Sequence, residues 1–339
     1  MKILSLHEAS FLQLQERRQH LPHALLLIGQ KGLGKFALAQ AFAASLLCEQ
    51  PDSHGKACGN CQACHWFSQG NHPDFRLLQP EALAETVDQE EGKKKPSQQI
   101  TIDQVRALDE FLGVGSHRGG QSIILVNPAE AMNRNAANAI LKILEEPPAH
   151  VHFLLVSNEP NRLLPTIRSR CQVMPLRVPS TEQAIAVLAA EGLEDAARWL
   201  AWNGGSIRFA MEMSAGKPLA WLESLSRALS AGQKIDALSL AGELDKQIKA
   251  SKGELTLKQL IETLQKWLVD LTLLKNGLPV RYFLDQEAKI GALAAMISPV
   301  RLIRLYRAMN QHRLEAEQPV NARLFLEGVF LDYRALFSR

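Results

Sequence analysis

The chain has 339 residues, 46% hydrophobic and 22% charged, and its 38 Lys and Arg against 35 Asp and Glu give a net charge of +3. This composition excludes the fibrous and disordered classes, and the length predicts two or three domains. The small net charge gives no global indication of nucleic-acid binding. No apolar run approaches the ~20 residues that span a bilayer, and no signal-peptide pattern opens the chain. We therefore expect a cytoplasmic protein without membrane contact.

Short apolar runs alternate with helical patterns in the first half of the chain. The runs resemble strands buried on both faces, at 24–28, 75–78, 123–126, 153–156 and 173–176. Helical periodicity covers 34–47, 102–112 and 134–144. This alternation predicts an α/β domain over residues 1–175, built on a parallel five-stranded sheet.

A phosphate-binding loop follows the first run. Gly29, Gly34 and Lys35 have the GxxxxGK spacing between a strand and a helix, where backbone N–H groups and the lysine cradle phosphates. A chance glycine-rich turn is the alternative, but strand, loop and helix occur in the required order. The next residue is Phe36, where the motif needs a hydroxyl for Mg²⁺. ATP and Mg²⁺ are therefore expected either to bind weakly or not at all, the loop then serving only the fold.

The carboxylates that hydrolysis needs are also missing from the end of the third strand. Asn127 and Pro128 occupy the positions where an Asp and a Glu would hold the metal and orient water. Glu130 lies three residues beyond the strand-end position, and we expect it to cap or flank the next helix. The sequence thus predicts no ATP hydrolysis by this chain. An autonomous ATPase with unusual metal ligands is the alternative.

Four of the five cysteines cluster after the P-loop helix, at Cys48, Cys58, Cys61 and Cys64. Four thiolates fill the tetrahedral coordination of Zn²⁺ and leave no open position, so we predict a structural zinc module over 48–64. A complete set of thiolates leaves no need for the nearby imidazoles of His54, His65 and His72. A zinc-dependent DNA-binding module is the competing function, although no Lys/Arg-rich helix follows the ligands.

The stretch 80–99 is polar and without periodicity, which predicts an exposed loop whose role stays open. Its lysines at 93–95 could contact phosphate, but a solvated loop is the favoured interpretation.

Only helical patterns follow Pro179, at 182–191, 196–202, 221–229, 257–274, 299–309 and 321–337. They predict a small helical domain over 176–212 and an all-helical domain over 213–339. One stripe at helical spacing contains Leu302, Leu305, Tyr306 and Met309. Three arginines recur on the same helix, for which a solvated face is favoured over a contact with DNA or a neighbour: Arg301, Arg304 and Arg307.

Three segments resemble those of the bacterial sliding-clamp loader subunits, which belong to the AAA+ proteins. They are NAILK at 138–142, LEEPP at 144–148 and SRC at 169–171, and they follow the cysteine module in the family's order. The resemblance covers roughly the first 210 residues. It implies an AAA+ P-loop domain with a zinc insertion, a helical lid and an oligomerising helical collar.

Within that family, the SRC arginine implies a role for Arg170 as an arginine finger that reaches the ATP site of a neighbouring subunit. A guanidinium there stabilises charge on the γ-phosphate, and Ser169 and Cys171 would position it. An ordinary surface arginine is the alternative, and Arg168 is a less favoured candidate for the same role.

Two further sites are implied by the family pattern. Arg208, in the second-domain segment 204–208, resembles a sensor arginine and would be a remnant in a non-hydrolysing chain. Ser157 and Asn158 occupy a sensor-like polar position after the fourth strand.

The resemblance as a whole implies a non-hydrolysing stator. Its partners would be gamma/tau-type ATPase subunits and the delta subunit of a hetero-oligomeric clamp loader. It would reach the sliding clamp and primer-template DNA through that complex. The complex is in turn part of the holoenzyme of a DNA-directed DNA polymerase, a nucleotidyltransferase.

Overall fold

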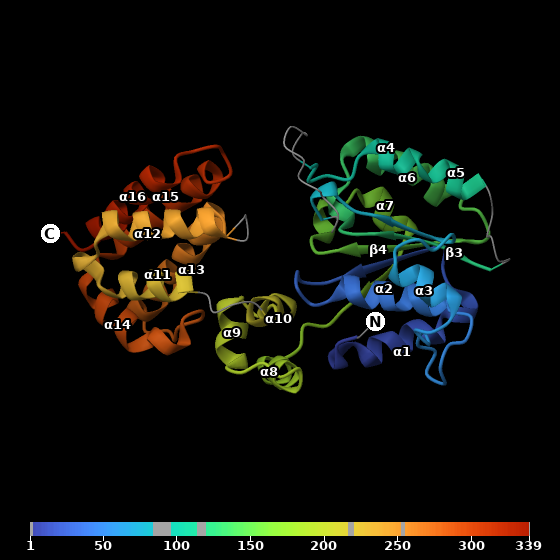
Figure 1. The fold of residues 1–339 in the computed structure, drawn as a ribbon, viewed down its shortest axis with the longest axis horizontal. Coiled ribbons are helices and arrows are strands. Elements are labelled where there is room, and N and C mark those ends of the chain that lie inside the picture. Colours follow the sequence, from blue (N-terminus) through green and yellow to red (C-terminus); the bar gives the residue numbers. More distant parts are fainter. Residues whose placement is uncertain (1–2, 84–95, 114–119, 216–219, 252–254, 339) are drawn as a thin grey trace. The chain divides into compact units, whose positions relative to one another are not determined.

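The computed structural model of the chain describes residues 3–83, 96–113, 120–215, 220–251 and 255–338. The chain divides into two compact units, Met1–Val187 and Leu188–Arg339 (Figure 1). The division into three domains at 175 and 212 stays a prediction. Most of the polar stretch 80–99, including the lysines at 93–95, lies outside the described residues.

The first unit is built on a five-stranded sheet in which every pairing is parallel, with strand order β2-β3-β4-β1-β5. Its strands are β1 (Ala24–Ile28), β2 (Phe75–Leu78), β3 (Ser122–Val126), β4 (Val151–Ser157) and β5 (Gln172–Pro175). All five strands expected from the sequence are therefore confirmed. Because Ile28 pairs with Ser157, the loops that leave β1 and β4 start side by side at one edge of the sheet.

Helices cover both faces of this sheet (Figure 1). One face packs against α1 (Glu8–Glu16), α2 (Lys35–Leu47) and α3 (Gln62–Ser68), and the other against α4 (Ile102–Arg106), α5 (Leu108–Gly113), α6 (Arg134–Glu145) and α7 (Pro165–Arg170). Successive strand residues point to opposite faces. Leu25 and Leu27 accordingly join the first core, and Ala24 and Leu26 the second.

The helical pattern expected over 102–112 is confirmed, but the chain forms two helices there, α4 and α5, with a turn at Ala107 between them. Val105, Leu108 and Phe111 are all buried. Residues spaced three apart drift around a continuous α-helix, so the turn keeps all three side chains directed at the core.

The second unit is helical. It contains part of α8 (Thr181–Ala190), and then α9 (Ala196–Trp202), α10 (Ile207–Ala215), α11 (Ala220–Ser230), α12 (Ala237–Ala250), α13 (Leu257–Lys275), α14 (Glu287–Met296), α15 (Pro299–Glu315) and α16 (Ala322–Ala335). All the helical patterns expected after Pro179 are confirmed, whereas α10, α12 and α14 were not foreseen. At the centre, Trp267 Nε1 donates to Tyr333 Oη at 3.0 Å, and Tyr333 Oη donates to the Leu229 carbonyl at 2.8 Å.

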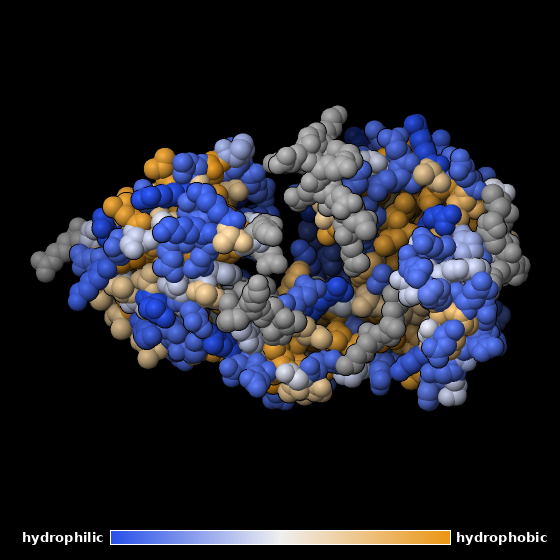
Figure 2. Space-filling model, in the orientation of Figure 1, coloured by the Kyte–Doolittle hydropathy of each residue, from blue (hydrophilic) through white to orange (hydrophobic). Residues whose placement is uncertain are grey.

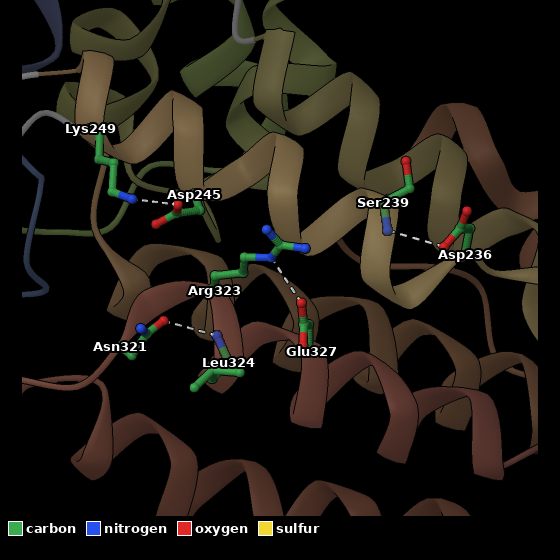
Figure 3. Close-up of polar contacts among 8 residues, drawn as sticks. All are labelled: Asp236, Ser239, Asp245, Lys249, Asn321, Arg323, Leu324 and Glu327. Atoms are coloured by element: carbon green, nitrogen blue, oxygen red, sulfur yellow. Dashed lines mark hydrogen bonds and ion pairs between the residues drawn. The ribbon is translucent and has the colours of Figure 1, made fainter.

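Side-chain caps fix the starts of α12 and α16, which pack on each other (Figure 3). Asp236 accepts from the backbone N–H of Ser239 at 3.0 Å, and Asn321 accepts from that of Leu324 at 3.2 Å. Such caps satisfy N–H groups that a helix start leaves without a partner. Pairs at i, i+4 support the same two helices, with Lys249 to Asp245 at 2.6 Å and Arg323 to Glu327 at 2.9 Å.

The face of the helical unit drawn in Figure 2 is mainly hydrophilic, with scattered hydrophobic residues. The predicted stripe on α15 is correct for Leu302, Leu305 and Met309, which are buried, but wrong for Tyr306, which is 38% exposed. Within the part of the chain that the structure describes, no helix has the length and apolarity needed to cross a bilayer.

Candidate functional site

The lysine of the P-loop is buried and its side chain is fully engaged by the protein. Gly34 has a left-handed φ of 84° and ends the loop, so that Lys35 begins α2. The Lys35 ammonium donates to the carbonyls of Gly29 at 2.8 Å and Gln30 at 2.6 Å, and to Asn158 Oδ1 at 2.9 Å. An ammonium has three N–H donors, so these bonds use all of them. Burial lowers the pKa of Lys35 to about 8, and the nearby carboxylate of Glu130 partly offsets this effect.

The positions that would hold Mg²⁺ offer neither a hydroxyl nor a carboxylate. Phe36 is half-buried and packs against the core on the α2 face of the sheet. Asn127 follows β3 directly, and its backbone N–H donates to the Leu78 carbonyl at 2.9 Å. Phe36 thus has no oxygen for a metal, and Asn127 has only a neutral amide oxygen where the motif has a carboxylate.

Of the two roles expected for Glu130, it flanks the following helix and does not cap it. The cap of α6 is Asn133, whose side chain accepts from the Ala136 N–H. Glu130 lies in the short helix η4 (Ala129–Ala131), and its Oε1 accepts from the backbone N and the Nδ2 of Asn158 at 2.9 and 3.0 Å. Asn158 thereby joins Glu130 to Lys35, which brings the sensor-like position to the P-loop.

A residue that the sequence did not single out also contacts the loop. His7 is buried in η1 (Ser5–His7), and its Nε2 donates to the Leu33 carbonyl. Burial lowers the pKa of His7, with Lys35 adding to the shift, so the imidazole stays neutral at physiological pH. A Cβ added to Gly34 would lie 3.4 Å from this Nε2. No spacing rule in the sequence connects His7 with the loop.

The four clustered cysteines converge as expected. Their sulfur atoms lie within 4.8 Å of one another, with 3.9 Å between Cys48 and Cys61 and between Cys58 and Cys64. A tetrahedron of Zn–S bonds has edges of about 3.8 Å, so the cluster has the size of a zinc site. Backbone N–H groups of Asn60 and Cys61 hold the pKa of Cys58 below its ordinary value, whereas burial raises the pKa of Cys48 and of Cys64. Within the described ranges, no histidine belongs to such a cluster.

Arg170 is the last residue of α7 and is paired within its own chain. Its Nη2 lies 2.6 Å from Glu145 Oε1, and its Nη1 donates to the Thr166 carbonyl at 3.1 Å. Ser169 Oγ donates to the same carbonyl at 3.0 Å, rather than to the arginine. Cys171 is buried, which raises the pKa of its thiol to about 11 and leaves it neutral.

The remaining predicted positions have the following contacts. Arg208 pairs with Glu212 one turn along α10 at 2.6 Å. Ser157 is buried at the end of β4, and its Oγ has no partner among the described residues. On α15, Arg301 donates to the Ser338 carbonyl, whereas Arg304 and Arg307 are exposed.

Comparison of the chain with known proteins identifies its family. A family model described as "DNA polymerase III, delta subunit" matches residues 7–180. The DNA polymerase III subunit delta' of Pseudomonas aeruginosa is 44% identical over 206 residues, covering 59% of this chain and 57% of that protein. The delta' subunit of Escherichia coli is 37% identical over 200 residues, covering 59% and 53%. The matched region thus spans little more than half the length of these two relatives.

Two further matches extend over nearly the whole chain. The delta' subunit of Yersinia pestis is 30% identical over 332 residues, covering 93% of this chain and 90% of that protein. Among solved structures, a DNA polymerase III gamma subunit-related protein from Thermotoga maritima has a TM-score of 0.51 at 16% identity, covering 97% of this chain and 99% of that one. This likeness supports the expected AAA+ fold. The chain belongs to the family of DNA polymerase III delta-prime subunits of the clamp loader.

Proposed function

We propose that the chain is a non-hydrolysing stator of the clamp loader, which donates Arg170 to the ATP site of a neighbouring subunit. Its partners are gamma/tau-type ATPase subunits and a delta subunit. It helps to load the sliding clamp on primer-template DNA during replication in the cytoplasm. The chain itself has no ATPase activity.

The observation that carries this proposal is the state of Lys35. All three of its N–H donors are bonded to Gly29, Gln30 and Asn158. A phosphate would have to displace at least one of these bonds inside a buried site, and no carboxylate stands at Asn127 to hold its metal. Both facts argue against turnover at this loop. The choice of Arg170, the last residue of α7, rests on the resemblance of the segment 169–171 to the SRC motif of the clamp-loader family.

The arginine finger is tested in the reconstituted clamp loader with primer-template DNA and clamp. Replacing Arg170 with alanine should leave assembly intact. The rate of hydrolysis at the neighbouring subunit's ATP site should fall ~10³-fold or more, which is the effect that an arginine finger usually has on kcat. Arg168→Ala, two residues earlier on the same helix, should keep normal turnover. A loss with Arg168→Ala alone would assign the finger to Arg168. Normal turnover with both variants would refute the finger.

We further propose that Zn²⁺ occupies the four-cysteine cluster as a structural ion. The size of the cluster and its four thiol ligands support this assignment. A metal with four protein ligands has no open position for substrate, so the ion would hold the segment 48–64 against α2 and take no part in chemistry.

One observation favours an autonomous ATPase as a second candidate. Glu130 Oε2 is buried, has no partner among the described residues, and belongs to a carboxylate close enough to Lys35 to affect its pKa. It could replace the missing acid. The purified chain alone would then hydrolyse ATP in a manner that depends on both Lys35 and Glu130, whereas our first proposal expects only background turnover.

A further inference from the structure

Arg170 and Glu145 come from two helices that end at the same place. Glu145 is the last residue of α6, and Arg170 is the last residue of α7. The two helices pack together, and Leu144 and Ile167 are buried in one core. The backbone on both sides of the ion pair is therefore held by hydrophobic packing.

Helix stability does not explain a carboxylate at this position. The C-terminal end of a helix carries partial negative charge, which disfavours a glutamate there and favours a cation. Glu145 lies at the unfavourable end of α6, where its 2.6 Å contact with the Arg170 Nη2 compensates its charge. Glu146, the next residue, is exposed, and among the described residues its side chain has no ion-pair partner.

The guanidinium is held from one side only. Glu145 contacts Nη2 and the Thr166 carbonyl accepts from Nη1, while Nε has no partner within the described part of the chain. The Arg170 side chain is 34% exposed and that of Glu145 49% exposed. These two contacts restrict the rotamers of the long Arg170 side chain. They leave the other N–H donors of the guanidinium open to solvent.

We propose that Glu145 is a positioning residue that holds Arg170 in the orientation in which it meets the neighbour's γ-phosphate. This inference rests on the proposed role of Arg170 as an arginine finger. Glu145 touches neither nucleotide nor water in the reaction. It acts through Arg170, and its effect is on the fraction of time during which the guanidinium is correctly placed.

The test is the DNA- and clamp-stimulated ATPase of the reconstituted clamp loader, with kcat and KM for ATP measured separately. Glu145→Ala should lower kcat about 3- to 10-fold with little change in KM, because a freed arginine must be ordered in each transition state. Glu145→Gln keeps an oxygen acceptor and should recover part of the loss. Glu146→Ala, the adjacent exposed glutamate, is the matched control and should behave as wild type.

A double-variant comparison separates positioning from a folding defect. Glu145→Ala should have no further effect on kcat once Arg170 is alanine, because the group it positions is gone. A partly exposed pair contributes little to folding stability, so the melting temperature of the isolated chain should change little.

Three outcomes would overturn the inference. Unchanged or increased kcat in Glu145→Ala, while Arg170→Ala is impaired, would refute the positioning role alone. A loss with Glu145→Ala that persists in the Arg170→Ala background would indicate a structural role. Full activity of Arg170→Ala itself would refute both the arginine finger and the positioning of it.

Discussion

The Asn158 side chain lies between a cation and an anion, because its Oδ1 accepts from Lys35 at 2.9 Å while its Nδ2 donates to Glu130 Oε1 at 3.0 Å. The backbone N–H of Asn158 donates to the same carboxylate oxygen at 2.9 Å. The P-loop lysine is therefore balanced by a carboxylate of its own chain. In this arrangement the negative charge that a nucleotide phosphate would bring is already present near the loop.

Glu130→Gln should increase the affinity of the isolated chain for ATP. The substitution removes a negative charge near the place where phosphates would bind, and even the charge interaction of about 1 kcal/mol found in water corresponds to roughly a fivefold change in dissociation constant. The measurement is a titration with ATP followed by calorimetry or by fluorescence of a labelled analogue.

The matched control is Glu146→Gln, which removes an equal charge at an exposed position at the end of α6. It should bind ATP as wild type does. If Glu130→Gln also binds ATP as wild type does, Glu130 does not oppose phosphate at this loop.

The pKa of Lys35 predicts a dependence of stability on pH. In the folded chain this pKa is about 8, against 10.5 for an ordinary lysine. Between these values the unfolded state binds more protons than the native state, so the free energy of unfolding rises with pH across this window. Below about pH 8 both states are protonated, and the cost of burying the charge is fully present.

Lys35→Met removes this contribution. The stability of wild type relative to Lys35→Met should therefore increase between pH 7.5 and 9.5, with a slope of at most about 1.4 kcal/mol per pH unit. Urea denaturation of both proteins at several pH values measures the difference. Curves that stay parallel over this window would show that the pKa of Lys35 is not lowered.

Much of the first unit could be predicted because its signals are local. The buried strands are continuous apolar runs, the P-loop has a fixed spacing, and the cysteines lie close together in sequence. The positions of Glu130 and His7 could not be predicted, since they depend on how η4 and η1 fold against the loops after β4 and β1. The pairing of Glu145 with Arg170 could not be predicted for the same reason, because it depends on the packing of α6 on α7. Helix α12 buries Leu240, Ala241 and Leu244 at helical spacing, so its pattern is present in the sequence and was missed. Helix α14 is apolar on most of its faces and has no clear amphipathic pattern.

Removal of zinc should unfold the segment around the cysteines and leave the sheet in place. Cys64→Ser should lose the zinc that we expect at about one per chain, because three thiolates hold a structural ion much less well than four. Metal analysis and protease sensitivity of residues 48–64 are the measurements. Cys171→Ser is the control, since this buried cysteine lies outside the cluster and should leave the zinc content unchanged. A metal-free wild type whose segment 48–64 still resists protease would contradict the assignment.

Replacing Asp270 in α13 should lower the free energy of unfolding of the helical unit more than most substitutions in that unit. Its side chain is 0% exposed, and it accepts hydrogen bonds from the backbone N–H groups of Arg281, Tyr282 and Phe283 at 2.8 to 3.2 Å. Asp270→Ala would leave these donors without a partner, at a cost of about 3 kcal/mol. For a unit of this size the melting temperature should fall by roughly 6 to 12 °C.

Asp285→Ala is the matched control for Asp270→Ala. Asp285 pairs with Arg198 at 3.6 Å, and both side chains are partly exposed, 41% and 38%. An exposed pair of this kind contributes about 0 to 1 kcal/mol, so the melting temperature should fall by no more than a few degrees. The two variants remove the same type of side chain from the same unit. They differ in that the buried Asp270 carboxylate accepts from backbone N–H groups, whereas the Asp285 carboxylate pairs with a partly exposed arginine. Equal shifts in melting temperature would mean that the loop after α13 is held by other contacts and that Asp270 does not organise it.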